Sequence, residues 1–186
     1  MNLSNIFKDH IKVINEIEKN CEIIFTAASK LTSILKNGNK ILFMGNGGSA
    51  ADSQHLAAEL IGRFQKERDS IPAIALTTDT SILTAIGNDY SFDDIFKRQV
   101  QGLANKGDAV FGISTSGNSK NVINALIEAK RKKAFTIALT GKDGGKIKEI
   151  ADLNIIVQSD VTARIQEGHI LIGHILCELI EEEFCG

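Results

Sequence analysis

The sequence lacks the features that would place the chain in a membrane or outside the cell. No apolar run reaches the roughly 18 residues that a membrane-spanning helix needs, and residues 1–10 lack the charged-then-apolar pattern of a secretory signal. The three cysteines, Cys21, Cys177 and Cys185, show neither disulfide nor metal spacing, which favours a reducing compartment. We therefore expect a cytoplasmic protein with no membrane partner.

The net charge of the chain is small, and proline is nearly absent. A net charge of −2 gives no strong field that would attract nucleic acid or an acidic lipid surface. Proline occurs once, at Pro72, which excludes a proline-rich linker between domains. A length of 186 residues, 43% of them hydrophobic, fits one domain with a substantial core. We expect residues 1–186 to form a single domain that does not bind nucleic acid.

Short apolar segments alternate with longer helical ones along most of the sequence. Each short segment is largely apolar on both faces, as in strands buried inside a parallel sheet. The expected strands are residues 40–44, 73–76, 109–113, 135–139 and 153–157, and the expected helices that follow them are residues 49–64, 92–104, 118–132, 146–150 and 162–183. This alternation predicts right-handed βαβ crossovers and an α/β fold, with a parallel sheet covered by helices on both faces.

A long amphipathic segment precedes the first expected strand. Apolar residues recur at roughly helical spacing from Leu3 to Leu35, and Asn37-Gly38-Asn39 supplies a stop signal. We expect one long helix here, with an apolar face that can pack on another subunit.

The first strand ends in the glycine-rich sequence Gly45-Asn46-Gly47-Gly48-Ser49, which runs into a helix. Glycines allow close approach of the backbone to a ligand, and a helix N-terminus directs N–H groups and a positive dipole end at an anion. The pattern also matches the dinucleotide fingerprint G-x-G-x-x-G/A. That fingerprint needs an acidic residue about 20 positions on, whereas the second strand ends only near Asp79. We expect an anionic ligand other than a nicotinamide cofactor; the alternative is a tight turn without a ligand.

A second candidate loop, residues 114–119, follows the third strand and opens another helix. Four hydroxyl groups lie within these six residues, on Ser114, Thr115, Ser116 and Ser119. Hydroxyl and backbone N–H groups at a helix N-terminus suit phosphate. N-capping by Ser116 or Ser119 needs only one hydroxyl, so the surplus favours a phosphate site. The nucleotide P-loop sequence G-x-x-x-x-G-K-[ST] is absent, and a small phosphorylated metabolite fits better.

His55 and Glu59 lie four residues apart on the first helix after the glycine-rich loop, and therefore share a face. Such a pair can supply a nitrogen and an oxygen ligand to Zn²⁺, or an acid and a base. Taken alone, the pair is more often a surface hydrogen bond. Its place just after an anion-binding turn adds weight to a functional role.

The last expected helix carries polar residues within a strongly apolar sequence. His169 is interpreted as a satisfied core residue, whereas a core role and a functional role are equally open for His174. At about 100° per residue, Glu167 is almost in line with His174, and Gln166 lies about 80° away. Spacing therefore leaves both Gln166 and Glu167 as candidates for a shared site.

Taken together, these motifs resemble the sugar isomerase (SIS) domain, and within it the phosphoheptose isomerases. The resemblance covers nearly the whole chain and includes Gly87-Asn88-Asp89, which by itself predicts only a polar loop. The motifs that carry it are residues 45–49, 87–89, 112–119, 139–145 and 164–167. The resemblance implies a three-layer α/β/α sandwich of the flavodoxin-like kind with a five-stranded parallel sheet. It also implies a homotetramer with active sites at subunit interfaces.

The resemblance assigns roles residue by residue. It implies one Zn²⁺ per subunit, held by His55, Glu59, Gln166 and His174, and so selects Gln166 over Glu167. It implies acid–base roles for Glu59 and His174. The positions that match substrate-binding residues of the family are Asn46, Gly47, Gly48, Ser49, Glu59, Asn88, Asp89, Ser114, Thr115, Ser116, Ser119 and Gln166.

The implied reaction is the aldose–ketose isomerisation of D-sedoheptulose 7-phosphate to D-glycero-D-manno-heptose 7-phosphate by enediol proton transfer. In this family it is the first step of bacterial ADP- or GDP-heptose biosynthesis, which serves lipopolysaccharide or capsule. One alternative is a non-catalytic protein with this fold, either a phosphosugar-binding module or a replication-initiator-associating protein. Another is an isomerase of a hexose or arabinose phosphate. The chain keeps Glu59 and His174, whose counterparts the replication-initiator-associating proteins lack, and this favours the enzyme.

Overall fold

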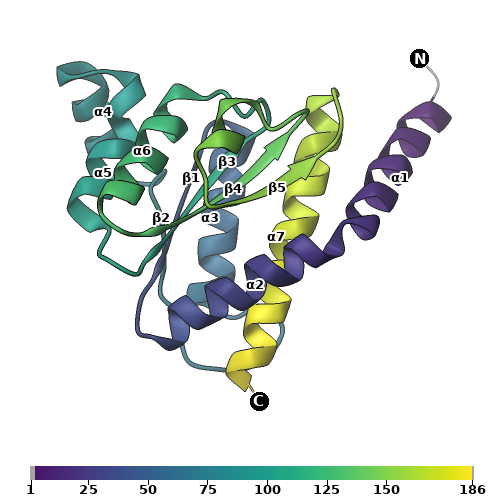
Figure 1. Cartoon of the computed structure of the whole chain (residues 1–186), viewed down its shortest axis with the longest axis horizontal. Coiled ribbons are helices and arrows are strands. Elements are labelled where there is room, and N and C mark those ends of the chain that lie inside the picture. Colours follow the sequence, from purple (N-terminus) through teal and green to yellow (C-terminus); the bar gives the residue numbers. More distant parts are fainter. Residues whose placement is uncertain (1–2, 186) are drawn as a thin grey trace.

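The computed structural model describes residues 3–185, which form a parallel sheet with helices on both of its faces (Figure 1). In chain order, the elements are α1 (Leu3–Lys19), α2 (Cys21–Lys36), β1 (Ile41–Gly45), α3 (Gly48–Ile61), β2 (Ala73–Ala75), α4 (Thr80–Asp89), η1 (Phe92–Asp94), α5 (Ile95–Leu103), β3 (Ala109–Ser114), α6 (Lys120–Arg131), β4 (Phe135–Gly141), η2 (Gly145–Glu149), β5 (Leu153–Val157) and α7 (Thr162–Cys185). All five expected strands are present, which confirms the alternation predicted from the sequence.

The sheet has the strand order β2-β1-β3-β4-β5, and each neighbouring pair is parallel. This is the strand order of the flavodoxin-like fold. Strands β1 and β3 are buried at every position, which explains why both faces of their sequences are apolar. The predicted three-layer sandwich with a five-stranded parallel sheet is therefore confirmed for the part of the chain that the structure describes.

Two apolar clusters fill the sandwich, one on each face of the sheet. Ile41 and Phe43 of β1 contribute to the cluster shared with α1, α2, α3 and α7. Leu42 and Met44 of the same strand contribute to the cluster shared with α5 and α6. This division follows from the two-residue period of a strand. Figure 1 accordingly shows α4, α5 and α6 on one side of the sheet and α2, α3 and α7 on the other.

The single helix expected from Leu3 to Leu35 is interrupted at Asn20, which separates α1 from α2. The Asn20 backbone has φ −109° and ψ 24°, outside helical geometry. Its side-chain amide donates a hydrogen bond to the Glu16 carbonyl oxygen at 2.8 Å. Asparagine side chains compete with the backbone for such groups, which accounts for the break. As a result, α1 diverges from the line of α2 toward the N-terminus (Figure 1).

Helix α4 is the element that the sequence analysis missed. The sequence predicts a loop at Asn88 and Asp89, but both lie in the last turn of α4. The helix is capped by Asp79, whose carboxylate accepts a hydrogen bond from the Ile82 N–H at 2.9 Å. None of the residues of α4, all of which the structure describes, is fully buried. Its apolar face is short, with Leu83 and Ile86 packed half-buried against the cluster shared with α5 and α6, so the helical pattern in its sequence covers little more than one turn.

Two further properties bear on the environment of the chain. Between residues 3 and 185, no helix combines the length and the hydropathy that spanning a membrane would require. Within the same range the three cysteines are free thiols, with Cys177 buried and Cys21 and Cys185 exposed.

His169 joins α7 to the sheet from the core position expected for it, but it is only partly satisfied, because its Nδ1 atom is buried without a hydrogen-bond partner among residues 3–185. Its side chain has no exposed surface, and its Nε2 atom lies 3.0 Å from the Thr140 carbonyl oxygen on β4. Burial lowers the pKa of His169 to about 4, and the hydrogen bond to Thr140 only partly opposes that shift. His169 is therefore neutral at physiological pH.

This burial predicts an acid-sensitive fold. Between pH 6.5 and pH 4, His169 takes up a proton in the unfolded chain but not in the folded one, so the free energy of unfolding falls as pH decreases. From pH 6.5 to pH 5 the expected loss is about 1.5 kcal/mol. Urea unfolding at several pH values should show it, and His169→Gln should flatten the profile in this window. An unchanged pH slope in that variant would contradict the assignment.

Candidate functional site

The candidate site lies at the carboxyl ends of β1 and β3, which are neighbours in the centre of the sheet. The chain leaves β1 for α3 on one face, and leaves β3 for α6 on the opposite face. Loops that diverge in this way open a crevice at the edge of an α/β sheet, where ligands bind in such folds. Both loops singled out in the sequence, residues 45–49 and 114–119, flank this crevice.

The glycine-rich loop makes the tight turn expected of it. Gly47 precedes the first residue of α3 and has a φ of +56°, a conformation that favours glycine. A Cβ atom on Gly48 would collide with the side-chain amide of Gln166 on α7. The absence of a side chain at Gly48 therefore makes room for Gln166, and brings two of the predicted substrate-binding residues into contact.

Helices α3 and α7 run side by side in the same direction from this point. Gly48 faces Gln166 at the start of the two helices. Two turns further on, Leu56 fills the space that a Cβ atom of Gly173 would occupy. This parallel register brings His174 of α7 opposite His55 of α3, although 118 residues lie between them in the sequence.

His55, Glu59 and His174 form a cluster of three potential metal ligands. Their ligand atoms all lie within 4.8 Å of one another. The His55 Nε2 atom is 3.0 Å from Glu59 Oε1 and 3.1 Å from His174 Nε2. Two imidazole nitrogens and one carboxylate oxygen match the protein ligands of zinc sites that keep an open coordination position. The donor set therefore fits Zn²⁺.

Gln166 is the member of the predicted ligand set that lies farthest along α7. It precedes His174 by eight residues, which is about 12 Å along the helix axis. Its amide packs on Gly48 at the N-terminal end of α3. Gln166 therefore faces the glycine-rich loop, and the three-residue cluster lies two turns below it.

A buried ion pair between Arg68 and Glu181 lies next to the cluster, at the C-terminal end of α3. Glu181 of α7 accepts hydrogen bonds from the backbone N–H groups of Phe64, Gln65 and Lys66 at 2.8–2.9 Å and from Arg68 Nε at 3.1 Å. Arg68 in turn donates to the Glu59 carbonyl oxygen at 2.8 Å. The pair thus fixes the C-terminal end of α3, which carries Glu59.

The aromatic ring of Phe64 packs next to the same cluster. The centroid of its ring is 5.6 Å from that of His174, and the His55 and His174 rings are 5.0 Å apart. Sequence reasoning missed both Phe64 and the Arg68–Glu181 pair. The signal for the pair was a glutamate within the apolar face of the last helix, which requires a buried partner.

One acidic residue next to the cluster has an unusual environment. Asp52 precedes His55 by three residues on α3, and its Oδ2 atom is buried without a hydrogen-bond partner among residues 3–185. Burial raises the pKa of the Asp52 carboxyl, while the nearby His55 lowers it.

In the serine-rich loop, the hydroxyl groups of Ser114 and Ser119 lie against each other. Ser119 precedes the first residue of α6, but its hydroxyl makes no capping bond there. The hydroxyl lies 2.8 Å from that of Ser114 instead. Ser116 accepts a hydrogen bond from the Asn118 N–H at 3.1 Å, and Thr115 is half-buried beside it. Neither Ser116 nor Ser119 caps α6, because the Ser116 bond goes to Asn118, ahead of the helix. The Ser114 and Ser119 hydroxyls meet at the carboxyl end of β3.

Asn88 and Asp89 are not brought into the crevice by a contact with the other site residues. Both are exposed, and Asn88 Nδ2 donates a hydrogen bond to Asp89 Oδ1 at 2.9 Å. They belong to α4, on the opposite side of the sheet from α3 and α7 (Figure 1). Ser49, in contrast, is buried in the first turn of α3.

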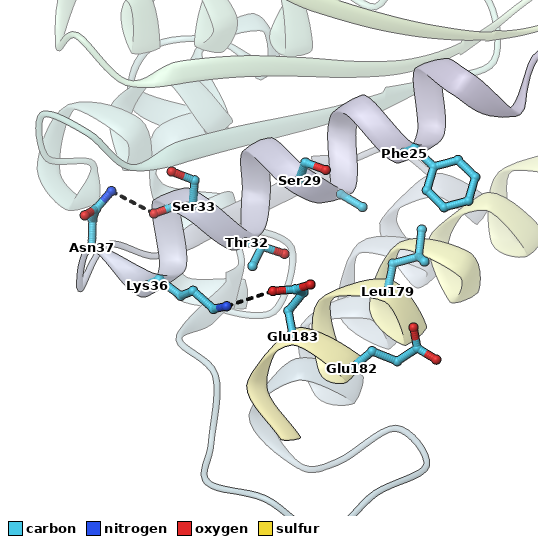
Figure 2. Close-up of a pocket in the computed structure, with 10 residues that line it drawn as sticks. Phe25, Ser29, Thr32, Ser33, Lys36, Asn37, Leu179, Glu182 and Glu183 are labelled. Carbon is cyan, nitrogen blue, oxygen red and sulfur yellow. Dashed lines mark hydrogen bonds and ion pairs between the residues drawn. The ribbon is translucent and has the colours of Figure 1, made fainter. Parts of the chain in front are cut away.

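A separate groove lies between α2 and the C-terminal part of α7 (Figure 2). Its volume is about 540 Å³, and the Lys36–Glu183 ion pair spans it at 2.8 Å. Ser29, Thr32 and Ser33 line one wall. The groove contains none of the predicted site residues, and its one lysine is already neutralised by Glu183. The groove is therefore not part of the candidate site.

The chain is similar in sequence and in structure to known proteins. Residues 7–141 match the family model described as the SIS domain. The chain is 62% identical to a phosphoheptose isomerase of a Nitratiruptor species, over 87% of this chain and 86% of that protein. It is 55% identical to a phosphoheptose isomerase of Aquifex aeolicus, over 98% and 96%. The structure of a phosphoheptose isomerase from Neisseria gonorrhoeae superimposes with a TM-score of 0.92 at 48% identity, covering 97% of both chains.

Proposed function

The chain belongs to the phosphoheptose isomerases of the SIS-domain family, and on this premise we propose how its site performs the reaction. The enzyme is an aldose–ketose isomerase that converts D-sedoheptulose 7-phosphate to D-glycero-D-manno-heptose 7-phosphate in heptose biosynthesis. The observation that carries the assignment of the site is the cluster of His55, Glu59 and His174, because it places an acid, a base and potential metal ligands together. We propose that residues 1–186 act as one SIS domain.

The serine-rich loop holds the phosphate group of the substrate. Hydroxyls of Ser114, Thr115, Ser116 and Ser119, with the N-terminus of α6 behind them, donate hydrogen bonds to the phosphate oxygens. The 2.8 Å contact between the Ser114 and Ser119 hydroxyls supports this role, because the two groups converge on one point. Binding energy at the phosphate then orients the reacting end of the sugar.

Glu59 and His174 move the protons of the isomerisation. One removes a proton from C1 of the ketose and returns it to C2, and the other transfers a proton between the two oxygens, so that the carbonyl and hydroxyl groups exchange places through an enediol. Both side chains contact His55, so they act within one cluster. The half-buried position of Glu59, with 24% of its side chain exposed, supports a base that retains access to substrate.

Zn²⁺ would be held by His55, Glu59 and His174. Gln166, which the resemblance implies as a fourth ligand, contacts Gly48 two turns away along α7, so the geometry supports only the other three residues as ligands. When bound, it supplies a positive charge that polarises the sugar carbonyl and stabilises developing negative charge on oxygen. The residues that line the sugar are Asn46, Gly47, Gly48 and Ser49 of the first loop, with Gln166 beside them. Within residues 3–185, Asn88 and Asp89 of α4 make no hydrogen bond to these residues, and we propose that they reach the site of a neighbouring subunit.

We propose a homotetramer with its active sites at subunit interfaces. Two surfaces support this. Leu3, Phe7 and Ile11 form an exposed apolar stripe along α1, with 55–69% of each residue accessible to solvent. Helix α4 buries none of its side chains fully within the chain and carries Asn88 and Asp89. The free thiols of Cys21 and Cys185 support a cytoplasmic location.

Turnover of sedoheptulose 7-phosphate by the purified chain tests the proposal. We expect the aldose product to appear, to be lost after treatment with a chelator, and to return on addition of Zn²⁺. Added Mg²⁺ serves as the control, since it prefers oxygen ligands to imidazole and should not restore turnover. Failure to form aldose with Zn²⁺ present would overturn the isomerase. Full turnover by the chelator-treated protein would overturn only the proposed role of the metal, and not the isomerase function.

A further inference from the structure

A reciprocal pair of side-chain amides joins the glycine-rich loop to helix α6. Asn46 Nδ2 donates to Asn121 Oδ1 at 2.9 Å, and Asn121 Nδ2 donates to Asn46 Oδ1 at 2.8 Å. Asn46 follows β1 and is half-buried, whereas Asn121 lies in the first turn of α6 and is only 2% exposed. The pair spans the crevice between the two diverging loops. Asn121 has no place in the proton transfer or the metal site described above.

The backbone of α6 fixes the orientation of both amides. The Val122 N–H donates to Asn121 Oδ1 at 2.9 Å. A flipped Asn121 amide would set two donors against each other, so its oxygen must face Val122 and Asn46 Nδ2. The orientation of the Asn46 amide follows from this, because its amino group must meet that oxygen. A helical N–H on one face of the sheet therefore orients a side chain on the loop that leads to the other face.

The start of α6 thus contacts both loops to which the proposed function assigns the substrate. Its entry residue, Ser119, directs a hydroxyl at Ser114 in the phosphate loop. Two residues later, Asn121 holds Asn46. We propose that Asn121 is a positioning residue, which orients the Asn46 amide toward the sugar and sets the spacing between the sugar end and the phosphate end of the site. This inference rests on the sugar-binding role of Asn46 given under the proposed function.

The competing explanation is that Asn121 only caps α6. The two explanations differ in what the loss of the side chain disturbs. A capping residue would hold the helix N-terminus that faces the phosphate, so its loss would weaken phosphate binding. A residue that acts through Asn46 would leave phosphate binding intact, and its loss would have no effect once Asn46 is gone.

A double-mutant cycle separates these explanations. The variants are Asn46→Ala, Asn121→Ala and the double variant, with Asn124→Ala as the matched control. Asn124 is half-buried on the same helix and also donates a side-chain hydrogen bond, to the Asp93 carbonyl oxygen at 3.0 Å. The measurements are kcat and KM for sedoheptulose 7-phosphate and the inhibition constant of inorganic phosphate. If Asn121→Ala does not fold, Asn121→Asp replaces it, because it retains the acceptor for the Val122 N–H.

We expect Asn121→Ala to lower kcat/KM about tenfold in the native background and less than about twofold in the Asn46→Ala background. The phosphate inhibition constant should stay within about twofold, and Asn124→Ala should behave like the native enzyme. Additive losses, or weaker phosphate binding in Asn121→Ala, would overturn the inference. Full activity in Asn46→Ala would also overturn the inference, but it would not contradict the proposed isomerase function. If the native chain shows no turnover, the proposed function fails, and the same cycle measured as affinity for sedoheptulose 7-phosphate still tests the coupling.

Discussion

Replacement of Glu59 by glutamine is expected to lower kcat for sedoheptulose 7-phosphate by about 10²–10⁴-fold, the usual contribution of a general acid or base. Glutamine has nearly the same shape as glutamate but cannot accept a proton from carbon. The phosphate contacts of the serine-rich loop are unaffected, so KM should change only a few-fold. Steady-state kinetics at saturating Zn²⁺ measure both quantities and separate the loss of the base from a weaker metal site.

The matched control for this variant is Glu67→Gln. It makes the same chemical change on the loop after α3, where 89% of the Glu67 side chain is exposed and its contact with Arg63 is a 3.7 Å surface pair. Such pairs contribute little to stability, and we expect native kinetics. A kcat of Glu59→Gln within about threefold of the native value would remove Glu59 from the chemistry.

Replacement of Glu181 by alanine is expected to destabilise the fold by about 3–5 kcal/mol. The side chains of Glu181 and Arg68 are only 2% and 4% exposed, so the change leaves a buried guanidinium and three backbone N–H groups without their acceptor. In a chain of this length, the melting temperature should fall by about 10 °C. Thermal unfolding followed by circular dichroism measures the shift.

Activity should fall in the same variant, even at temperatures where it stays folded. Arg68 holds the carbonyl oxygen of Glu59, and Glu181 holds the backbone of Phe64 beside His174. Glu182→Ala is the matched control, since Glu182 is the next residue on α7 and is exposed. A native melting temperature in Glu181→Ala, or an equal loss in Glu182→Ala, would show that the buried pair does not stabilise this end of α3.

The strands of the sheet were predictable because strands that are buried on both faces consist almost entirely of apolar residues. Strands β1 and β3 are buried at every position, and each reads as a continuous apolar run between polar turns. The two loops that flank the crevice were predictable for a related reason. Glycines and clustered hydroxyl residues have specific backbone and hydrogen-bonding uses, which few other positions in a chain require.

The elements that the sequence did not reveal are those whose structure depends on single side chains. The break between α1 and α2 depends on one hydrogen bond from the Asn20 side chain, against a periodicity that continues on both sides. Helix α4 has a good N-cap in Asp79, but its apolar face is short and only half-buried at Leu83 and Ile86, so periodicity did not identify it. In both cases a side-chain hydrogen bond determines where the helix begins or ends, and the hydrophobic pattern does not indicate that position.

The site was only partly predictable, because pairings over a long sequence distance leave no local pattern. His55 and Glu59 could be paired from their spacing within one helix. Spacing could not choose between Gln166 and Glu167, whereas the structure packs Gln166 against Gly48 and pairs Glu167 with Arg164 and His10. Asn121 was missed because its partner, Asn46, lies more than 70 residues away in the sequence. Arg68 was missed because it bonds Glu181, which is also distant in the sequence, and a backbone carbonyl oxygen, that of Glu59.

The parallel register of α3 and α7 determines where the chain can change in length. The 118 residues between His55 and His174 include the loops that connect the remaining strands and helices, and insertions in those loops would leave the two helices side by side. A single residue inserted between Gly48 and His55 would instead turn His55 by about 100° away from His174. Evolutionary insertions and deletions should therefore gather in the outer loops, while the segments from Gly48 to Glu59 and from Gln166 to His174 keep a constant length.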